Sequence, residues 1–269
     1  MKLWKKQLKK TICLKISLNR KGYVMWVSTQ RGALSPRIKQ AVSAMRIGKL
    51  TGEEYKITWP RHFWCHCPFR YLFKNDIEIP DDKIPKDAKI LGGWRFYTTK
   101  EEPKNIDFMF DKVPEPIKSQ FLECYKELII SDSISELVNN YIKENGEPTI
   151  AVHARTWFDM PADKRRPFNI KDVEMAIQSV KNKHENIFVC SDDPKTEEYL
   201  RRKYHCHSTK KMGNVQRIPD IESVKDALVD ILIGSKANKL ILTHTSTFSE
   251  NMWWFGQGKA QVIETSRRK

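Results

Sequence analysis

The chain has 269 residues and a net charge of +15, and 40% of its residues are hydrophobic and 10% aromatic. This composition supplies enough apolar residues for the core of one large or two modest domains. It excludes an intrinsically disordered protein. The charge favours an anionic partner: nucleic acid, an anionic membrane surface or a phosphorylated small molecule.

The pattern of apolar residues predicts neither a membrane span nor a signal peptide. No apolar run approaches the length of a membrane span, and lysines interrupt residues 1–15, where a signal peptide needs an apolar core. We therefore expect a soluble, cytoplasmic protein. Residues 1–10 form a short basic amphipathic segment that could lie on a membrane surface, on an acidic partner or on the domain itself. Contact with the domain is the favoured alternative, and peripheral membrane contact stays open.

Six cysteines occur without a secretion signal, so we expect reduced and mostly buried thiols. A zinc site is the alternative, because two short segments carry soft ligands, namely His62, Cys65, His66 and Cys67 in one and His205, Cys206 and His207 in the other. Structural zinc sites usually place at least two residues between paired cysteines, which Cys65 and Cys67 do not satisfy. The sequence predicts no metal site.

The first half begins with a βαβ pattern. Residues 23–27 form a predicted strand, and residues 28–36 form a loop rich in small and basic residues. A helix follows, with Pro36 in its first turn and apolar residues at helical spacing as far as Leu50. A second strand is predicted at residues 55–59, and parallel pairing of the two strands is expected.

The middle of the chain, residues 60–116, is predicted to be structured but irregular, because prolines interrupt it and aromatic residues anchor it. These aromatic rings could stack on sugars or nucleobases, but filling a core between short elements is the favoured interpretation. Helices are predicted at residues 117–130 and 134–143, followed by a break at residues 144–148. The break divides the chain into two predicted domains, 1–145 and 146–269.

The second half repeats the alternation of strands and helices. Strands are predicted at residues 149–152, 186–190 and 239–242, and helices at residues 171–181, 195–204 and 223–235 and after residue 249. Polar residues follow each strand: Arg155 after the first, Asp192 and Asp193 after the second, and Thr245, Ser246 and Thr247 after the third. Each group has an ordinary explanation as a turn or helix cap. If the strands are parallel neighbours, however, the groups meet in one crevice at the carboxyl edge of the sheet.

Arg155 is the first candidate for a phosphate ligand. It leaves a buried β-branched strand and enters a loop, where a guanidinium group can bind an anion with two parallel hydrogen bonds. The alternative is that His153 and Arg155 form only a satisfied polar pair at the end of a strand.

Three motifs of the second half resemble the nucleotide-sugar domain of fucosyltransferase-like glycosyltransferases, the group of protein O-fucosyltransferases, core fucosyltransferases and nodulation fucosyltransferases. The matching segments are His153-Ala154-Arg155, residues 187–194 with their Asp-Asp-Pro end, and Asp230 followed by residues 240–248. The resemblance covers about residues 149–255. It implies an α/β fold with two Rossmann-like halves, of the GT-B-like type, and a donor site at the carboxyl ends of the second-half strands.

The resemblance also implies roles for individual residues. Arg155 would bind the donor diphosphate and His153 would support its loop. Asp192 and Asp230 would lie near the base or ribose, and Ser246 and Thr247 would hydrogen-bond phosphate. The same motifs add further donor-binding candidates: Asp193, Thr245 and Phe248.

The first half departs from the family in the loop after its first strand. The family usually has a glycine-rich turn ending in asparagine, whereas residues 31–37 contain one glycine and no asparagine. Gly32, with Arg31 or Arg37, is expected to take part in donor binding in a reduced form of that turn. Asn238 stands where many relatives have an aspartate.

The predicted activity is transfer of a sugar, most directly fucose from GDP-fucose, to a glycan hydroxyl, with the nucleotide sugar as co-substrate and no cofactor. Arginine and hydroxyl donors would stabilise the departing diphosphate without a metal, although Asp192 and Asp193 could instead bind Mg²⁺. Asp159 is the candidate base for the acceptor hydroxyl, with a solvated loop carboxylate as the alternative.

Two other functions stay open at this point. One is a transferase that uses another nucleotide sugar, such as UDP-xylose. The other is a basic nucleic-acid-binding protein, suggested by basic runs at residues 164–166, 201–203 and 267–269. The positive charges are scattered along the whole chain, however, and no common recognition motif is present, so nucleic acid is not a predicted partner.

Overall fold

The computed structural model describes residues 24–158, 160, 166, 168–182, 185–213 and 219–265. The basic amino-terminal segment, Cys13 and Asp159 lie outside these residues, and the predictions made for them stay predictions.

The first half contains a small parallel sheet. Its strands are β1 (Met25–Ser28), β2 (Glu54–Ile57) and β3 (Lys89–Leu91), in the order β2-β1-β3. Both pairings are parallel, so the predicted βαβ unit is confirmed. Strand β3 was not predicted, because its three residues lie within the irregular middle of the chain and carry no alternation long enough to detect.

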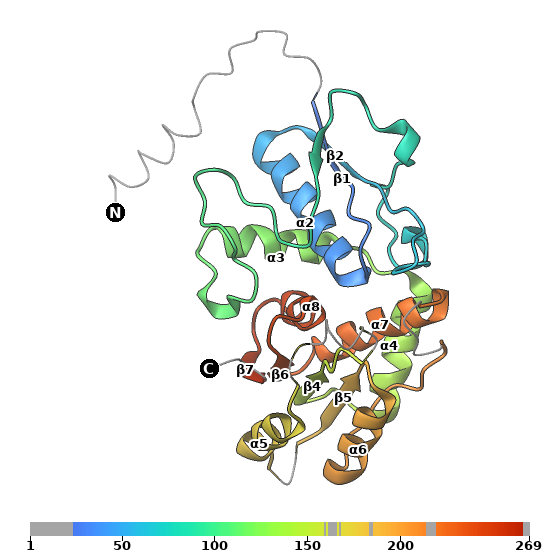
Figure 1. Ribbon diagram of the computed structural model, residues 1–269, viewed down its shortest axis with the longest axis vertical. Helices are drawn as coiled ribbons and strands as arrows, with labels where there is room; N and C mark the ends of the chain where they lie inside the picture. The colour runs from blue at the N-terminus through green and yellow to red at the C-terminus, as the bar shows by residue number, and fades with distance from the viewer. Residues whose placement is uncertain are drawn as a thin grey trace, which may run out of the picture.

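Helix α2 (Leu34–Thr51) is the central element of the first half, and Pro36 lies in its first turn as predicted. It packs on β1 and β2 and also on α3 (Ile117–Glu127) and α8 (Thr247–Phe255) (Figure 1), and its residues from Leu34 to Gly48 are buried except Pro36. Polar side chains on α2 are therefore buried, and they need partners within the protein. The buried guanidinium of Arg46, for example, is paired with Glu102.

The segment between β2 and α3 is irregular, as predicted, with short 3₁₀ turns η1 (Phe69–Tyr71), η2 (Asp81–Lys83) and η3 (Phe110–Lys112). Five of its aromatic rings are buried in the core, as the favoured interpretation requires, namely Trp59, Phe69, Phe73, Phe96 and Phe110. Phe96, for example, packs against Phe121 of α3 and Trp254 of α8. Phe63 and Trp94 are partly exposed.

Helix α4 (Asp132–Asn145) connects the halves. It precedes the predicted domain boundary, yet it packs on α7 (Ile221–Gly234) (Figure 1). Tyr141 of α4 also contacts Phe188, which belongs to a strand of the second half. The division at residue 145 stays a prediction.

The second half contains a parallel sheet of four strands, β4 (Ile150–Ala154), β5 (Ile187–Ser191), β6 (Lys239–Thr243) and β7 (Gln261–Thr265). The order is β5-β4-β6-β7, and every pairing is parallel. The three predicted strands are thus parallel neighbours, with β4 between the other two. Their carboxyl ends lie at the same edge of the sheet.

Helices cover both faces of this sheet, because the side chains of each strand alternate between two cores. Helices α5 (Ile170–Val180) and α6 (Pro194–Tyr204) share one core with Val152 and Ile241. Helices α7 and α8 share the other core with Ala151 and Leu240, and this core continues into the first half (Figure 1). The expected α/β architecture with two parallel sheets is confirmed.

Two further predictions concern the chain as a whole. In the described part of the chain, no helix combines the length and apolar character that crossing a membrane requires. The five cysteines in that part are buried free thiols, as predicted: Cys65, Cys67, Cys124, Cys190 and Cys206.

Candidate functional site

A pocket of about 330 Å³ lies between the two halves, at the carboxyl edge of the second sheet. The second half contributes the ends of β4 and β5, the first turn of α8 and one face of α7. The first half contributes the first turn of α2 and Trp64. The crevice predicted from the three strand ends therefore exists, and the residues it brings together are His153, Arg155, Asp192, Asp230, Ser246, Thr247 and Phe248.

Arg155 is held in place through its backbone and through its guanidinium. Its backbone N–H donates to Thr243 Oγ1 at 2.9 Å, and its guanidinium contacts Asp192 Oδ2 at 2.9 Å. Asp192 in turn accepts hydrogen bonds from the backbone N–H groups of Thr156 (2.6 Å) and Phe158 (3.1 Å). The side chain of Arg155 is 24% exposed and lines the pocket, so a ligand can reach it without unfolding its support.

His153 links the end of β4 to α8. Its Nδ1 lies 2.7 Å from Ser249 Oγ, and its ring stacks on Phe248 with 4.4 Å between the ring centroids. Burial, together with the nearby charges of Arg155 and Lys211, lowers the pKa of His153 to about 3. The imidazole is therefore neutral at physiological pH, and it orients the first turn of α8 without adding charge.

Helix α8 points its amino terminus at the pocket. Ser246 is its N-cap residue, and Thr247 and Phe248 form the start of the helix. The backbone N–H groups of a first turn have no acceptor within the helix, and the helix dipole adds partial positive charge there. Such an end binds anions, and here it is combined with two hydroxyl groups and the guanidinium of Arg155.

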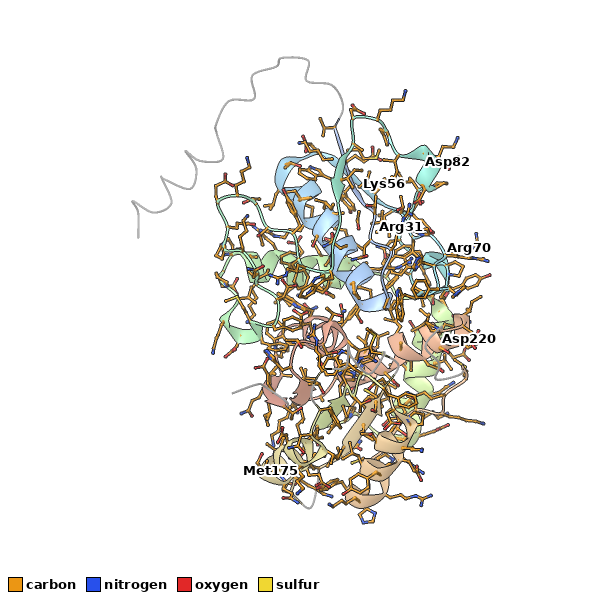
Figure 2. All side chains as sticks on the ribbon, in the orientation of Figure 1. Arg31, Lys56, Arg70, Asp82, Met175 and Asp220 are labelled. Carbon is orange, nitrogen blue, oxygen red and sulfur yellow. The ribbon has the colours of Figure 1, made fainter. Side chains whose placement is uncertain are left out.

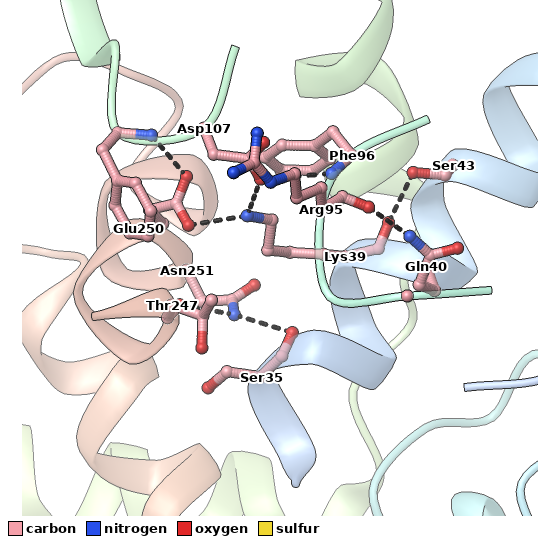
Figure 3. Close-up of polar contacts among 12 residues, drawn as sticks. Ser35, Lys39, Gln40, Ser43, Arg95, Phe96, Asp107, Thr247, Glu250 and Asn251 are labelled. Atoms are coloured by element: carbon pink, nitrogen blue, oxygen red, sulfur yellow. Dashed lines mark hydrogen bonds and ion pairs between the residues drawn. The ribbon is translucent and has the colours of Figure 1, made fainter. Parts of the chain in front are cut away.

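The first turn of α2 meets α8 across the pocket. Asn251 of α8 donates from Nδ2 to the carbonyl of Ser35 at 3.2 Å, and Tyr125 donates from its hydroxyl to Asn251 Oδ1 at 2.8 Å. Figure 3 shows Ser35 and Asn251 facing each other between the two helices. These bonds fix the two helix ends relative to each other.

One turn further along, a buried ionic cluster joins the same two helices. Lys39 of α2 donates to Asp107 and to Glu250 Oε2 of α8, the latter at 2.7 Å (Figure 3). The lysine side chain is fully buried, and its ammonium group lies 4.4 Å from the ring centroid of Phe96. Glu250 also accepts from the backbone N–H of Phe108 at 2.8 Å. The cluster holds the two walls of the pocket together.

The α7 wall of the pocket is acidic. Asp230 is buried there and is paired with Lys211, which also donates to Thr209 Oγ1 at 2.7 Å. Asp226, one turn earlier, accepts from the backbone N–H groups of residues 212 and 213, at 2.8 and 2.9 Å. Lys211 and Asp226 were not predicted from the sequence. No periodic pattern marks residues 208–213, and only the fold brings them beside α7.

Two predicted donor-binding residues of the second half do not line the pocket. Asp193 caps α6, accepting from the backbone N–H groups of Lys195 and Thr196, both at 3.2 Å. Thr245 has a positive φ of 62° and its hydroxyl accepts from Arg166. Both side chains are engaged in local structure, and their contact with the donor stays a prediction.

The three residues of the first half that were predicted to take part in donor binding do not line the pocket either, and their role stays a prediction. Arg37 is buried, and its guanidinium donates to the carbonyl groups of Gly32 (2.7 Å) and Pro60 (2.8 Å). Arg31 lies in the first half (Figure 2) and forms an exposed ion pair with Asp81. Gly32 itself does not line the pocket, although residues 33–36 do. Arg37 is thus a support for two segments that end at the pocket, the start of α2 and the loop before Trp64.

The alternative of a metal at Asp192 and Asp193 does not match their positions. Asp192 is turned toward Arg155 and Asp193 toward α6, so the two carboxylates serve different partners. Among the residues that the structure describes, no group of three or more histidine, cysteine, aspartate or glutamate side chains is arranged to hold a metal ion.

Searches against protein-family models and against curated protein sequences give no match for this chain. Solved structures are similar in fold. The chain aligns with the fucosyltransferase NodZ from Bradyrhizobium with a TM-score of 0.59 and 15% identity, over 91% of this chain and 94% of NodZ. A variant of Arabidopsis thaliana FUT1 in complex with GDP gives a TM-score of 0.62 and 13% identity, over 98% of this chain and 74% of that one. POFUT1 in complex with GDP-fucose gives 0.53 and 15% identity, over 94% and 100%.

These alignments span both halves, so the similarity in fold to the fucosyltransferase structures extends over the whole arrangement of two sheets. The resemblance stated from three short motifs is confirmed at the level of the fold, and the GT-B-like architecture with it.

Proposed function

We propose that the chain is a glycosyltransferase that moves a sugar from a nucleoside diphosphate donor to a hydroxyl group of a glycan. GDP-fucose is the favoured donor. One observation carries the proposal. Arg155, the amino terminus of α8 and the hydroxyl groups of Ser246 and Thr247 meet in a single pocket between two α/β halves. Each of these groups binds anions, and together they match a diphosphate.

The chemistry follows from the charge that builds up during transfer. As the bond between the sugar and the diphosphate breaks, negative charge accumulates on the leaving phosphate. Donors fixed in advance stabilise this charge more effectively than water, because they need no reorganisation. Arg155 is fixed by Asp192, and the α8 amides are fixed by the helix and by its bonds to α2.

We propose that this departure needs no metal ion, because the guanidinium of Arg155 and the positive end of α8 supply the required charge. Support comes from Asp192, whose oxygens are engaged with Arg155, with Thr156 and with the N–H of Phe158. Transfer that continues undiminished in excess EDTA is the expected result, and a requirement for Mg²⁺ would contradict it.

The donor and acceptor are proposed on separate grounds. GDP-fucose is favoured because fold neighbours such as NodZ and POFUT1 were crystallised or soaked with it. A glycan acceptor is favoured because aromatic side chains line or border the pocket, and flat rings pack well on the apolar faces of sugars. Trp64 and Phe158 line it, and the partly exposed ring of Phe63 lies 4.5 Å from that of Trp64. Asp159, next to Phe158, stays the candidate base.

Thermal-shift titration with GDP, UDP, GDP-fucose and UDP-xylose tests donor binding directly. A ligand at about 100 times its dissociation constant stabilises the folded state by about 2.7 kcal/mol, which raises the melting temperature measurably. We expect the largest shift with GDP or GDP-fucose, and no shift with free fucose. A melting temperature that none of these nucleotides changes would contradict the proposal.

A further inference from the structure

We propose that Lys211 selects the nucleobase of the donor by donating a hydrogen bond to a ring carbonyl oxygen, so that guanine or uracil is accepted and adenine is rejected. This inference rests on the proposed function, since it concerns the donor of that reaction.

The two ends of the pocket differ in charge. The end formed by Arg155 and α8 attracts phosphate, as argued above. The α7 wall carries Asp226 and Asp230, two buried carboxylates that repel phosphate. A nucleoside diphosphate that fills the pocket must therefore place its phosphates at α8 and its nucleoside against α7.

Lys211 is fixed at this α7 wall. Its ammonium group is paired with Asp230 and donates to Thr209 Oγ1 at 2.7 Å, and Thr209 in turn donates to Asp230 Oδ1 at 2.7 Å. Burial alone would lower the pKa of Lys211, but the charges of Asp230 and Glu197 raise it above its ordinary value. The group therefore stays charged.

One hydrogen of the ammonium group is left for a ligand. An ammonium group has three N–H donors, and Asp230 and Thr209 take two of them. Glu197 Oε2, at 4.0 Å, is too distant for a hydrogen bond. Since Lys211 lines the pocket, a ligand acceptor can take the third hydrogen.

The Lys211–Asp230 pair places a hydrogen-bond donor, the ammonium group, beside a hydrogen-bond acceptor, the carboxylate. Only some nucleobases present the complementary pair of groups. Guanine and uracil both present a carbonyl oxygen next to a ring N–H, so the oxygen faces Lys211 and the N–H faces Asp230. Adenine presents an amino group next to a bare ring nitrogen, the opposite order. With adenine, the amino group would face the ammonium and the bare nitrogen would face the carboxylate, and both contacts are repulsive.

Calorimetric titration with GDP, UDP and ADP tests the inference, because the three share the diphosphate and differ in the base. The test variant is Lys211→Met, which keeps the length of the side chain and removes its charge. Lys210→Met, at the exposed neighbouring lysine, is the matched control. Because Lys211→Met leaves Asp230 buried without its cation, the double variant Lys211→Met/Asp230→Asn is measured in parallel as a neutral pair.

The wild type should bind GDP or UDP about 10- to 100-fold more tightly than ADP, the range expected for a hydrogen bond to a charged group. In Lys211→Met and in the double variant this preference should fall to within about threefold, because GDP and UDP lose a hydrogen bond and ADP is no longer repelled by the ammonium group. Lys210→Met should keep the wild-type preference.

Three results would overturn the inference, and they are distinguishable. Equal weakening of all three nucleotides would make Lys211 a phosphate contact. An unchanged preference in both Lys211 variants would remove it from base selection. A wild type that binds none of the three would refute the proposed function itself and this inference with it.

Discussion

Arg155 combines the two properties that a transition-state donor needs, a fixed position and access to the ligand. Asp192 and Trp157 hold its guanidinium, the former at 2.9 Å and the latter with its ring centroid 5.9 Å away. Because the group borders a pocket and not the core, its removal should change chemistry more than folding.

Arg155→Ala and Arg155→Lys test this separation. Lysine keeps the charge but loses the planar fork that binds two phosphate oxygens, so both variants should impair transfer. We expect turnover to fall by about 10² to 10³, with a melting temperature close to that of the wild type. Both quantities are measured on the same preparations.

Arg202→Ala is the control, because this arginine lies on the exposed face of α6 and pairs only locally with Glu198. It should leave transfer unchanged. An Arg155→Ala protein that is clearly less stable but transfers sugar at nearly the wild-type rate would show that Arg155 is a structural residue.

The sequence predicted the residues that lie at strand ends and missed those that only the fold brings to the pocket. Arg155, His153 and Asp192 follow β4 and β5 directly, so the carboxyl edge of the sheet collects them. Lys211 is paired with a residue 19 positions away, and no local pattern indicates that pair. The sequence also gave no sign of the partners of Arg37, whose guanidinium donates to two backbone carbonyls from the buried first turn of α2.

At the level of elements, uninterrupted β-branched runs identified β4, β5 and β6, and helical spacing identified the helices between them. The pattern could not predict which elements pack around α2. Its apolar residues suggested one buried face, whereas the structure buries it from several sides. The difference arises because packing by α3 and α8 depends on residues more than 70 positions away.

Gly48 shows how closely α2 approaches its sheet. A Cβ atom at this position would lie 2.5 Å from Tyr55 Cδ1 and 3.0 Å from the carbonyl oxygen of Glu53. Alanine in place of glycine normally stabilises a helix by about 0.5 to 1 kcal/mol. Here the steric overlap should outweigh this gain, and we expect Gly48→Ala to destabilise the protein by about 1 to 3 kcal/mol.

Urea unfolding at equilibrium provides the measurement. Gly92→Ala is the control, because a Cβ there meets no atom within 4 Å and its φ is not positive. Its free energy of unfolding should match the wild type. A Gly48→Ala variant as stable as the control would mean that α2 can move away from β2 at little cost.

At the scale of the whole molecule, the Lys39 cluster joins the two halves next to the pocket (Figure 3). Lys39→Met would leave Asp107 and Glu250 buried without a cation. Such a loss typically costs about 3 to 5 kcal/mol. Adding Glu250→Gln removes one of the two carboxyl groups that lack a cation in Lys39→Met, so the double variant should recover part of that stability in the same urea titration. A double variant less stable than Lys39→Met would contradict this account.

The same cluster predicts how stability depends on pH. Burial raises the pKa of Glu250 to about 7 from an ordinary value of 4.5, even though Lys39 opposes the shift and Asp107 adds to it. The contribution of protonated Glu250 to the free energy of unfolding is therefore complete below pH 4.5 and is lost as the pH rises through 7. His153 behaves in the opposite way. Its pKa is lowered from 6.5 to about 3, so its effect is complete above pH 6.5 and is lost as the pH falls through 3.

Between pH 4.5 and 6.5 the two groups act against each other, each with a slope of up to about 1.4 kcal/mol per pH unit. Glu250→Gln should therefore gain stability relative to the wild type as the pH rises through this window, and His153→Asn should lose it. Other carboxylates titrate in all three proteins, so the difference between each variant and the wild type isolates the group that was changed. Urea unfolding at several pH values measures these differences. Parallel curves for Glu250→Gln and the wild type would mean that Glu250 is ionised throughout, with Lys39 outweighing the cost of burial.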